Sequence, residues 1–388
     1  MKQLILSIFI LCSAIPVIAQ QKNNNSFKNN EIQDIVLIYY GGSNRRLSWT
    51  PEHFIPYLTH TFQNGRKEWL FPGFLFLDFS VDDKFLIHLK DPKTVYATKI
   101  EWQKFIDKTF EKGRALDALD KSIEEQKKEL GLPPFRHKVI FTIPTPISGQ
   151  KNWGSLDGKP LDFSILSHKI KALKWFINQM LQLFQQSHYQ NIDLEGFYWV
   201  EEGMWVTDDV LAPVSAMLKK NGKSFYWIPY YTSAGSESWE KYGFNYSYIQ
   251  PNYFFRPQMA QERFLQALET AKRIGCGLEM EIDDKLLNNP SVFVPRLKTY
   301  IDLFEAHNVY DSNAAIAYYE GGGTIWHLYK EMFPANLTNS DKKAIMDQID
   351  RMAKHIVDRN NSKMKGSKKT NIERKKNYDW RDPEYWHF

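Results

Sequence analysis

Short apolar runs alternate with amphipathic segments from residue 34 to residue 357. Eight of the runs are rich in β-branched and aromatic residues, which is typical of buried strands. These runs span residues 34–40, 73–80, 138–143, 191–203, 223–229, 246–250, 277–284 and 314–319. Helical spacing occupies residues 51–62, 99–130, 164–186, 208–220, 236–242, 261–274, 290–307 and 341–357. Eight strands alternating with helices predict one α/β domain, a (β/α)8 TIM barrel over residues 34–358.

An open, doubly wound sheet is the structural alternative to the barrel. That fold places a G-x-G-x-x-G turn after an early strand. No such turn follows any of the eight runs, and the glycine run Gly321 to Gly323 comes after the last strand. The pattern therefore favours the closed barrel, with the glycine run as a loop at its rim.

The two ends of the chain differ from this repeating pattern. Residues 1–19 have Lys2, an apolar stretch and a small-residue cleavage pattern, which predict a secretory signal peptide. A lipoprotein signal needs a small residue just before its cysteine, but Leu11 precedes Cys12, so the pattern disfavours a lipoprotein. Residues 20–33 are a polar, flexible lead, and residues 359–388 a basic tail. We expect an exported protein, periplasmic or extracellular, without stable membrane insertion.

Charge and cysteine content narrow the classes of partner. The formal net charge is +5, and most of the excess lies in the lysine-rich residues 363–376. A solvated lysine run without a nucleic-acid motif does not predict nucleic-acid binding. Cys276 is the only cysteine after the signal, so stability must come from a large core, in which Cys276 is a small buried side chain.

Carboxylates at the ends of the fourth and seventh strands are the main candidates for chemistry. Glu201 and Glu202 follow a buried aromatic run directly, and Glu279 and Glu281 share one face of the seventh strand. Burying such groups is costly unless they are paired or used. Asp193 and Glu195 lie nearer the start of their strand, where a structural role at the bottom of the barrel is expected.

The last residues of the strands face the active-site end of a TIM barrel. The candidates for substrate binding there are Tyr40, Asp78, Trp199, Tyr230, Tyr231, Gln250, Asn252, Tyr253, Tyr319 and Glu320. The strand ends carry no His/Cys metal cluster, no Ser or Cys nucleophile beside a histidine and no phosphate loop.

Carboxylates among amides and aromatic rings suit the hydrolysis of a glycosidic bond in an oligosaccharide or polysaccharide. This mechanism requires no cofactor or metal. A non-catalytic glycan-binding barrel is the alternative, and a lyase or a metal-assisted hydrolase a third hypothesis. The sequence makes no prediction of oligomeric state.

Six stretches carry a family resemblance: DIVLIYYGG, FLFLDFS, GFYWVEE, FYWIPYY, IQPNYFF and GLEMEID. They resemble a secreted bacterial family known as domain of unknown function 4855, which is grouped with barrel glycosidases. In that superfamily the strand-four glutamate is the acid/base and the strand-seven glutamate the nucleophile. In the family motif after GFYWV the acid aligns with Glu202, so the resemblance implies Glu202 as the acid/base, with Glu201 as the alternative. Glu281 is the expected nucleophile because it lies nearer the C-terminal end of its strand, with Glu279 as the alternative.

Two features depart from the superfamily pattern. Glu201 stands where asparagine commonly precedes the strand-four glutamate, and the aromatic residue on strand eight is tyrosine instead of tryptophan. Strict alternation from Asp193 and Glu195 would also put Glu201, and not Glu202, on the inner face. A β-bulge at the strand end would reconcile the two arguments.

Overall fold

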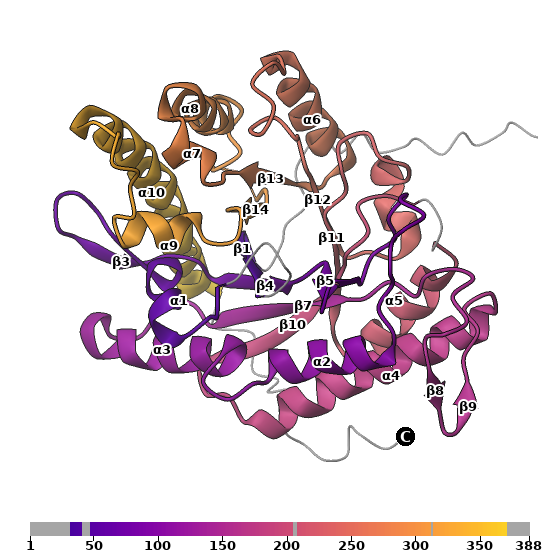
Figure 1. Ribbon diagram of the computed structural model, residues 1–388. Coiled ribbons are helices and arrows are strands. Elements are labelled where there is room, and N and C mark those ends of the chain that lie inside the picture. The colour runs from indigo at the N-terminus through magenta and orange to yellow at the C-terminus, as the bar shows by residue number, and fades with distance from the viewer. Residues whose placement is uncertain (1–31, 41–46, 205–207, 312, 371–388) are drawn as a thin grey trace, which may run out of the picture.

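The structure is a computed structural model that describes residues 32–40, 47–204, 208–311 and 313–370 (Figure 1). Eight parallel strands close into a barrel in which each strand pairs with its neighbours in chain order. The strands are β1 (Asp34–Tyr39), β4 (Gly73–Leu77), β7 (His137–Ile143), β10 (Ile192–Trp199), β11 (Ser224–Trp227), β12 (Tyr246–Ile249), β13 (Gly277–Glu281) and β14 (Ile316–Tyr319). The predicted (β/α)8 barrel is confirmed.

Helices surround the barrel on the outside (Figure 1). They are α1 (Pro51–Leu58), α2 (Lys99–Thr109), α3 (Ala115–Leu130), α4 (Leu166–Ser187), α5 (Leu211–Lys220), α6 (Gln261–Ile274), α7 (Lys285–Asn288), α8 (Pro290–Ala306), α9 (Thr324–Tyr329) and α10 (Asn339–Thr370), with 3₁₀ turns η1 (Asp208–Val210) and η2 (Ser236–Tyr242). Three hairpins decorate the loops: β2 (Thr59–Thr61) with β3 (Lys67–Trp69), β5 (Ser80–Val81) with β6 (Lys84–Phe85), and β8 (Ser155–Leu156) with β9 (Lys159–Pro160). Within the described ranges, no helix is long and apolar enough to cross a membrane.

Several element boundaries differ from the sequence pattern. The segment expected to be one helix over residues 99–130 forms two helices, α2 and α3. Gly113 and Ala115 have φ of 78° and 40°, which is not helical geometry, so the helix is interrupted there. The helix expected to end near residue 62 stops at Leu58, where the β2/β3 hairpin begins. Helix α10 continues to Thr370, through the start of the segment expected as a basic tail. The predicted signal peptide and residues 20–31 of the lead lie outside the described residues.

The core has two parts, one inside the barrel and one between the strands and helices. Ile35, Leu37 and Tyr39 of β1 point into the inner cluster, while Val36 and Ile38 belong to the outer one. The buried Cys276 belongs to the outer cluster, as predicted. Alternation of this kind along the strands decides which side chains can reach the barrel interior.

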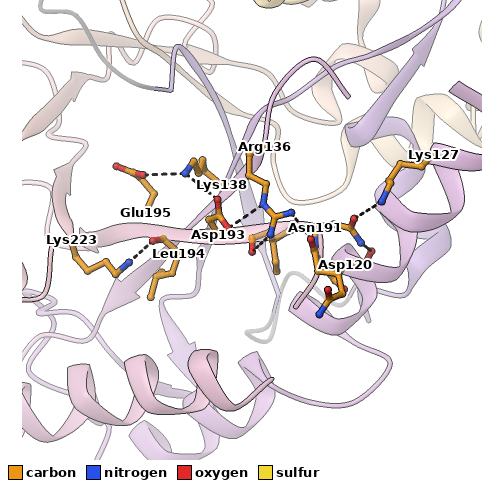
Figure 2. A network of polar contacts seen from close by, with 11 residues as sticks. Asp120, Lys127, Arg136, Lys138, Asn191, Asp193, Leu194, Glu195 and Lys223 are labelled. Carbon is orange, nitrogen blue, oxygen red and sulfur yellow. Dashed lines mark hydrogen bonds and ion pairs between the residues drawn. The ribbon is translucent and has the colours of Figure 1, made fainter. Parts of the chain in front are cut away.

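Charged side chains close the bottom of the barrel beside β7, β10 and β11 (Figure 2). Asp193 accepts from Arg136 Nε at 3.1 Å and from Lys138 Nζ at 3.2 Å. Glu195 Oε2 lies 4.0 Å from Lys138 Nζ. The structural role predicted for Asp193 and Glu195 is therefore confirmed.

The buried His137 makes the fold sensitive to acid. Its side chain is 0% exposed between Trp69, Phe74 and Phe135, and neither ring nitrogen has a hydrogen-bond partner in the described chain. Burial lowers the pKa of His137 from 6.5 to about 3. The unfolded chain therefore takes up a proton below pH 6.5 that the folded chain refuses, and stability falls with falling pH.

We expect this one residue to cost about 3 kcal/mol of unfolding free energy at pH 4 relative to pH 7. His137→Phe keeps an aromatic ring in the same apolar cage and removes the titrating group. Urea unfolding at the two pH values should show a drop about 3 kcal/mol smaller in the variant than in the wild type. An equal drop in both proteins would assign the acid sensitivity elsewhere.

Candidate active site

A β-bulge in the middle of β10 decides which glutamate reaches the barrel interior. The register of β10 against β7 shifts between Leu194 and Gly196, so Glu195 is the extra residue. The next residue is glycine, and it has to be, because a Cβ at position 196 would lie 2.2 Å from the Ser224 carbonyl oxygen. Beyond the bulge, Tyr198 and Val200 point inward and Trp199 points outward.

Continuing that alternation puts Glu202 on the inner face and Glu201 on the outer one. The bulge thus lies seven residues before Glu202, not at the strand end where the sequence argument put it. Only the residues after the bulge alternate in the phase that places Glu202 on the inner face of the barrel. A pattern counted from Asp193 and Glu195 cannot anticipate this change.

Glu202 lies at the mouth, partly buried. Burial raises the pKa of its carboxyl, and a hydrogen bond from the Gln250 side chain offsets part of that rise. The carboxylate therefore has one defined polar partner and a face that is still accessible, a combination that suits proton transfer.

Glu201 is enclosed instead. Its side chain is 5% exposed, Oε1 accepts the His88 amide at 2.6 Å, and its carbonyl oxygen accepts Trp227 Nε1 at 2.6 Å. Burial raises the pKa of Glu201, against the hydrogen bond from the His88 amide. These contacts tie the loop at His88 to the end of β10.

Leu278 and Met280 of β13 belong to the outer cluster. The side chains of Glu279 and Glu281, which alternate with them, therefore point into the barrel. Their surroundings differ sharply. Glu279 is 4% exposed, and no hydrogen bond to its carboxyl comes from the described residues. Burial, then repulsion by Glu281 and Glu202, raise the pKa of Glu279 well above its usual value. Its surroundings therefore favour the neutral, protonated form of Glu279 over the anion.

Glu281 is fully buried and fully bonded. Its oxygens accept the amides of Asn252 (2.6 Å), Tyr253 (2.9 Å) and Phe254 (3.1 Å) and the Tyr300 hydroxyl (2.6 Å). Burial raises the pKa of Glu281, and these donors oppose the rise. Of the two glutamates on β13, Glu281 is the better stabilised as an anion.

Strand register aligns Glu202 and Glu279 in one row with Tyr230 and Gln250 between them. The Tyr230 amide donates to the Glu202 carbonyl oxygen at 3.0 Å, and Tyr230 bridges to Gln250. Ile249 pairs with Leu278, so one residue further along Gln250 lies beside Glu279. We call these residues the carboxylate row: Glu202, Tyr230, Gln250 and Glu279. It ends in two carboxyl groups, with an amide and a phenol between them.

The other predicted site residues divide between the mouth and the outer layer. Tyr319 lies at the mouth, with its ring edge-on to Tyr39 at 5.7 Å and to Phe255 at 5.3 Å. Tyr231 lies beside Tyr230, with the Arg263 guanidinium of α6 over both rings. Asn252 joins the row through Nδ2, which donates to Gln250 Oε1 at 3.3 Å.

Asp78 and Glu320 hold the backbone of their own loops. Asp78 Oδ1 accepts the Phe79 amide at 2.7 Å. Glu320 accepts the amides of Gly322 (3.0 Å), Gly323 (2.9 Å) and Ile325 (3.1 Å) and the Tyr57 hydroxyl (3.0 Å), and burial raises its pKa to about 7. It fixes the rim loop that starts α9.

Three predicted ligands face the helices instead of the barrel. Tyr40 packs on Phe105 and hydrogen-bonds Thr109 on α2 at 2.6 Å. Trp199 and Tyr253 belong to the outer cluster. These three side chains are not brought together with the carboxylate row.

Three residues near the row were missed by the sequence argument. Phe79 lines the mouth, with its ring edge-to-face against Tyr39 at 5.7 Å, and Tyr300 and Arg296 of α8 support β13 and the loop before α6. Tyr300 and Arg296 gave no signal, since their partners come from distant parts of the chain.

Eight parallel strands with acidic and aromatic residues at their carboxyl ends define the class, a TIM barrel whose candidate active site lies at the usual end. The chain belongs to the family described as Domain of unknown function (DUF4855), whose model matches residues 34–351. No curated protein matches the chain.

Proposed function

We propose that the protein hydrolyses a glycosidic bond with two carboxyl groups, Glu202 and Glu279, at the ends of the carboxylate row. The observation that carries the proposal is the row itself, with two inward carboxyl groups on either side of Gln250. Glycoside hydrolysis needs one carboxylic acid to protonate the leaving oxygen and one carboxylate to attack or to activate water.

Proton sharing supports this division of labour. Repulsion from Glu202 contributes to the raised pKa of Glu279, so the two groups resist losing both protons. Of the two groups Glu279 takes up the proton more readily, because burial is deeper there and no donor from the described residues stabilises its anion. Glu279 is then the acid and Glu202 the base or nucleophile, with the hydrogen bond from Gln250 favouring the Glu202 anion.

The aromatic rings at the mouth suit a sugar substrate. Tyr39, Tyr319, Phe79 and Phe255 form a chain of edge-to-face contacts beside the row. Such rings pack against the apolar faces of pyranose rings, while amides such as Gln250 and Asn252 bond hydroxyl groups. An oligosaccharide or polysaccharide is accordingly the proposed substrate, and an exported location is the proposed setting.

The test is hydrolysis of a panel of polysaccharides, oligosaccharides and aryl glycosides by the wild type and by a Glu202→Gln, Glu279→Gln double variant. We expect the wild type to cleave at least one glycoside and the folded double variant to cleave none. Equal cleavage by both proteins would refute the assignment. Binding of a glycan without cleavage by the wild type would support the non-catalytic barrel instead.

A further inference from the structure

The loop between β12 and α6 is held from two sides by buried charges of opposite sign. Glu281 accepts three consecutive amides of this loop, those of residues 252–254. Arg296 takes its carbonyl groups: Nε donates to Tyr253 O and Phe254 O at 3.1 Å each, and Nη1 to Pro257 O at 3.2 Å. Glu281 is 0% exposed and Arg296 is 7% exposed.

This clamp is continuous with the carboxylate row. Asn252 gives its amide to Glu281 Oε1 and has a φ of 51°, a backbone conformation that asparagine adopts more readily than most residues. Its side-chain Nδ2 donates to Gln250 Oε1 at 3.3 Å. Gln250 Nε2 donates to the Ile228 carbonyl oxygen at 2.9 Å. The Gln250 side chain also lies beside the Glu202 carboxyl, where it opposes the rise of that group's pKa.

The direction of these bonds fixes the Gln250 amide. Its oxygen accepts from the Asn252 amide group and its nitrogen donates to the Ile228 carbonyl oxygen, so the nitrogen is on the side of Ile228 and Glu202. An amide turned the other way would present an oxygen to the Glu202 carboxylate and lose the stabilising bond. The clamp thus acts on Glu202 through the side chains of Asn252 and Gln250.

We propose that Glu281 is a positioning residue that, together with Arg296, clamps the loop over residues 251–259 and so orients Gln250 toward Glu202. Glu281 itself touches no reacting atom in this assignment. The consequence for rate rests on the proposed function, but the orientation of Gln250 does not.

The experiment is a carbon-13 NMR titration of glutamate-labelled protein, which reports the pKa of Glu202 without any substrate. Asn252→Gly removes the side-chain link while tolerating the positive φ, and Gln250→Leu removes the donor. Both variants should raise the pKa of Glu202 by about one pH unit, the value of one hydrogen bond to a charged group. Glu281→Gln should raise it as well, although loss of a nearby negative charge alone would lower it.

Glu320→Gln is the matched control. Glu320 is also fully buried with three amide donors and one tyrosine hydroxyl, but it holds the loop before α9. It should lower the melting temperature as Glu281→Gln does and leave the pKa of Glu202 in place. An unchanged pKa in Asn252→Gly and Gln250→Leu would overturn the proposal, and so would a lowered one in Glu281→Gln.

Activity separates this proposal from the proposed function. If the wild type cleaves a glycoside, Asn252→Gly should lower kcat about tenfold and move the acidic limb of the pH profile upward. If Glu281→Gln instead abolishes cleavage while the pKa of Glu202 stays constant, Glu281 is the nucleophile and the positioning role is wrong. If nothing is cleaved, the proposed function fails while the titration still decides the clamp.

Discussion

Glu202→Gln is expected to lower kcat/KM by about 10²- to 10⁴-fold on every glycoside that the wild type cleaves, the usual contribution of a positioned acid or base. Glutamine keeps the shape of the side chain and its contact with Gln250 but can neither attack nor accept a proton. Initial rates of the purified, folded variant measure the effect. Its unfolding free energy should stay close to that of the wild type, because Glu202 is partly exposed and its burial opposes ionisation.

Glu201→Gln is the matched control for this change. It alters the neighbouring residue in the same way, but Glu201 is enclosed and bonded to the His88 amide. We expect its kcat/KM to stay within about tenfold of the wild type, with a loss of stability as the main effect. A catalytic loss in Glu201→Gln with normal activity in Glu202→Gln would mean that the inner phase of β10 has been assigned to the wrong residue.

The leaving group of the substrate distinguishes the two proposed roles. A dinitrophenyl glycoside needs little protonation to depart, so loss of the acid matters little for it. Glu279→Gln should therefore spare cleavage of that substrate while impairing cleavage of natural glycans, and Glu202→Gln should impair both. The reverse pattern would give the acid role to Glu202, as the superfamily resemblance implies.

Arg359→Ala is expected to destabilise the fold by about 3–5 kcal/mol, because it removes the guanidinium from the buried carboxylate of Asp34. Arg359 Nε donates to Asp34 Oδ2 at 3.0 Å, with exposed side-chain fractions of 4% and 0%. The same guanidinium donates to the carbonyl oxygen of Val309 at 3.1 Å, and the Tyr318 hydroxyl completes Asp34 at 2.9 Å. Urea unfolding at pH 7 measures the loss.

Arg351 provides a control on the same helix. It pairs with Asp302 and Glu305 at 2.9 Å each, but all three side chains are about a third or more exposed. Arg351→Ala should therefore cost no more than about 1 kcal/mol. Equal effects of the two substitutions would mean that the Asp34 site is hydrated and that its burial has no energetic consequence.

Much of the fold could be predicted from sequence because each strand is a local, uninterrupted apolar run. The same runs do not show which side chains point into the barrel and which point toward the helices. DIVLIYY has no polar residue to mark its phase, so nothing in it separates the inward Tyr39 from the outward Tyr40. On β13 alternating glutamates mark the phase, and there Glu279 and Glu281 could be assigned to one face.

Long-range contacts account for what the pattern missed. The bulge at Glu195 depends on how β10 meets both β7 and β11, including the close approach of Gly196 to Ser224. Arg359 sits in a charged stretch and looks solvated, yet its partner Asp34 lies 325 residues away. Arg296 likewise acts on a loop 43 residues before it, and Tyr300 on Glu281, 19 residues before it. Such roles follow from closure of the barrel, and no local pattern encodes them.

The bond between Arg359 and Asp34 also sets an order of events during synthesis. Asp34 begins the first barrel strand, and its partner is among the last described residues to leave the ribosome. The β1 and β14 strands can meet earlier, but Asp34 does not receive the Arg359 guanidinium until α10 arrives. A polypeptide that ends at residue 351, where the family match stops, would contain every barrel strand and still lack this bond. Expression of the shorter chain should therefore yield protein that aggregates or is degraded, whereas extension to residue 370 restores solubility.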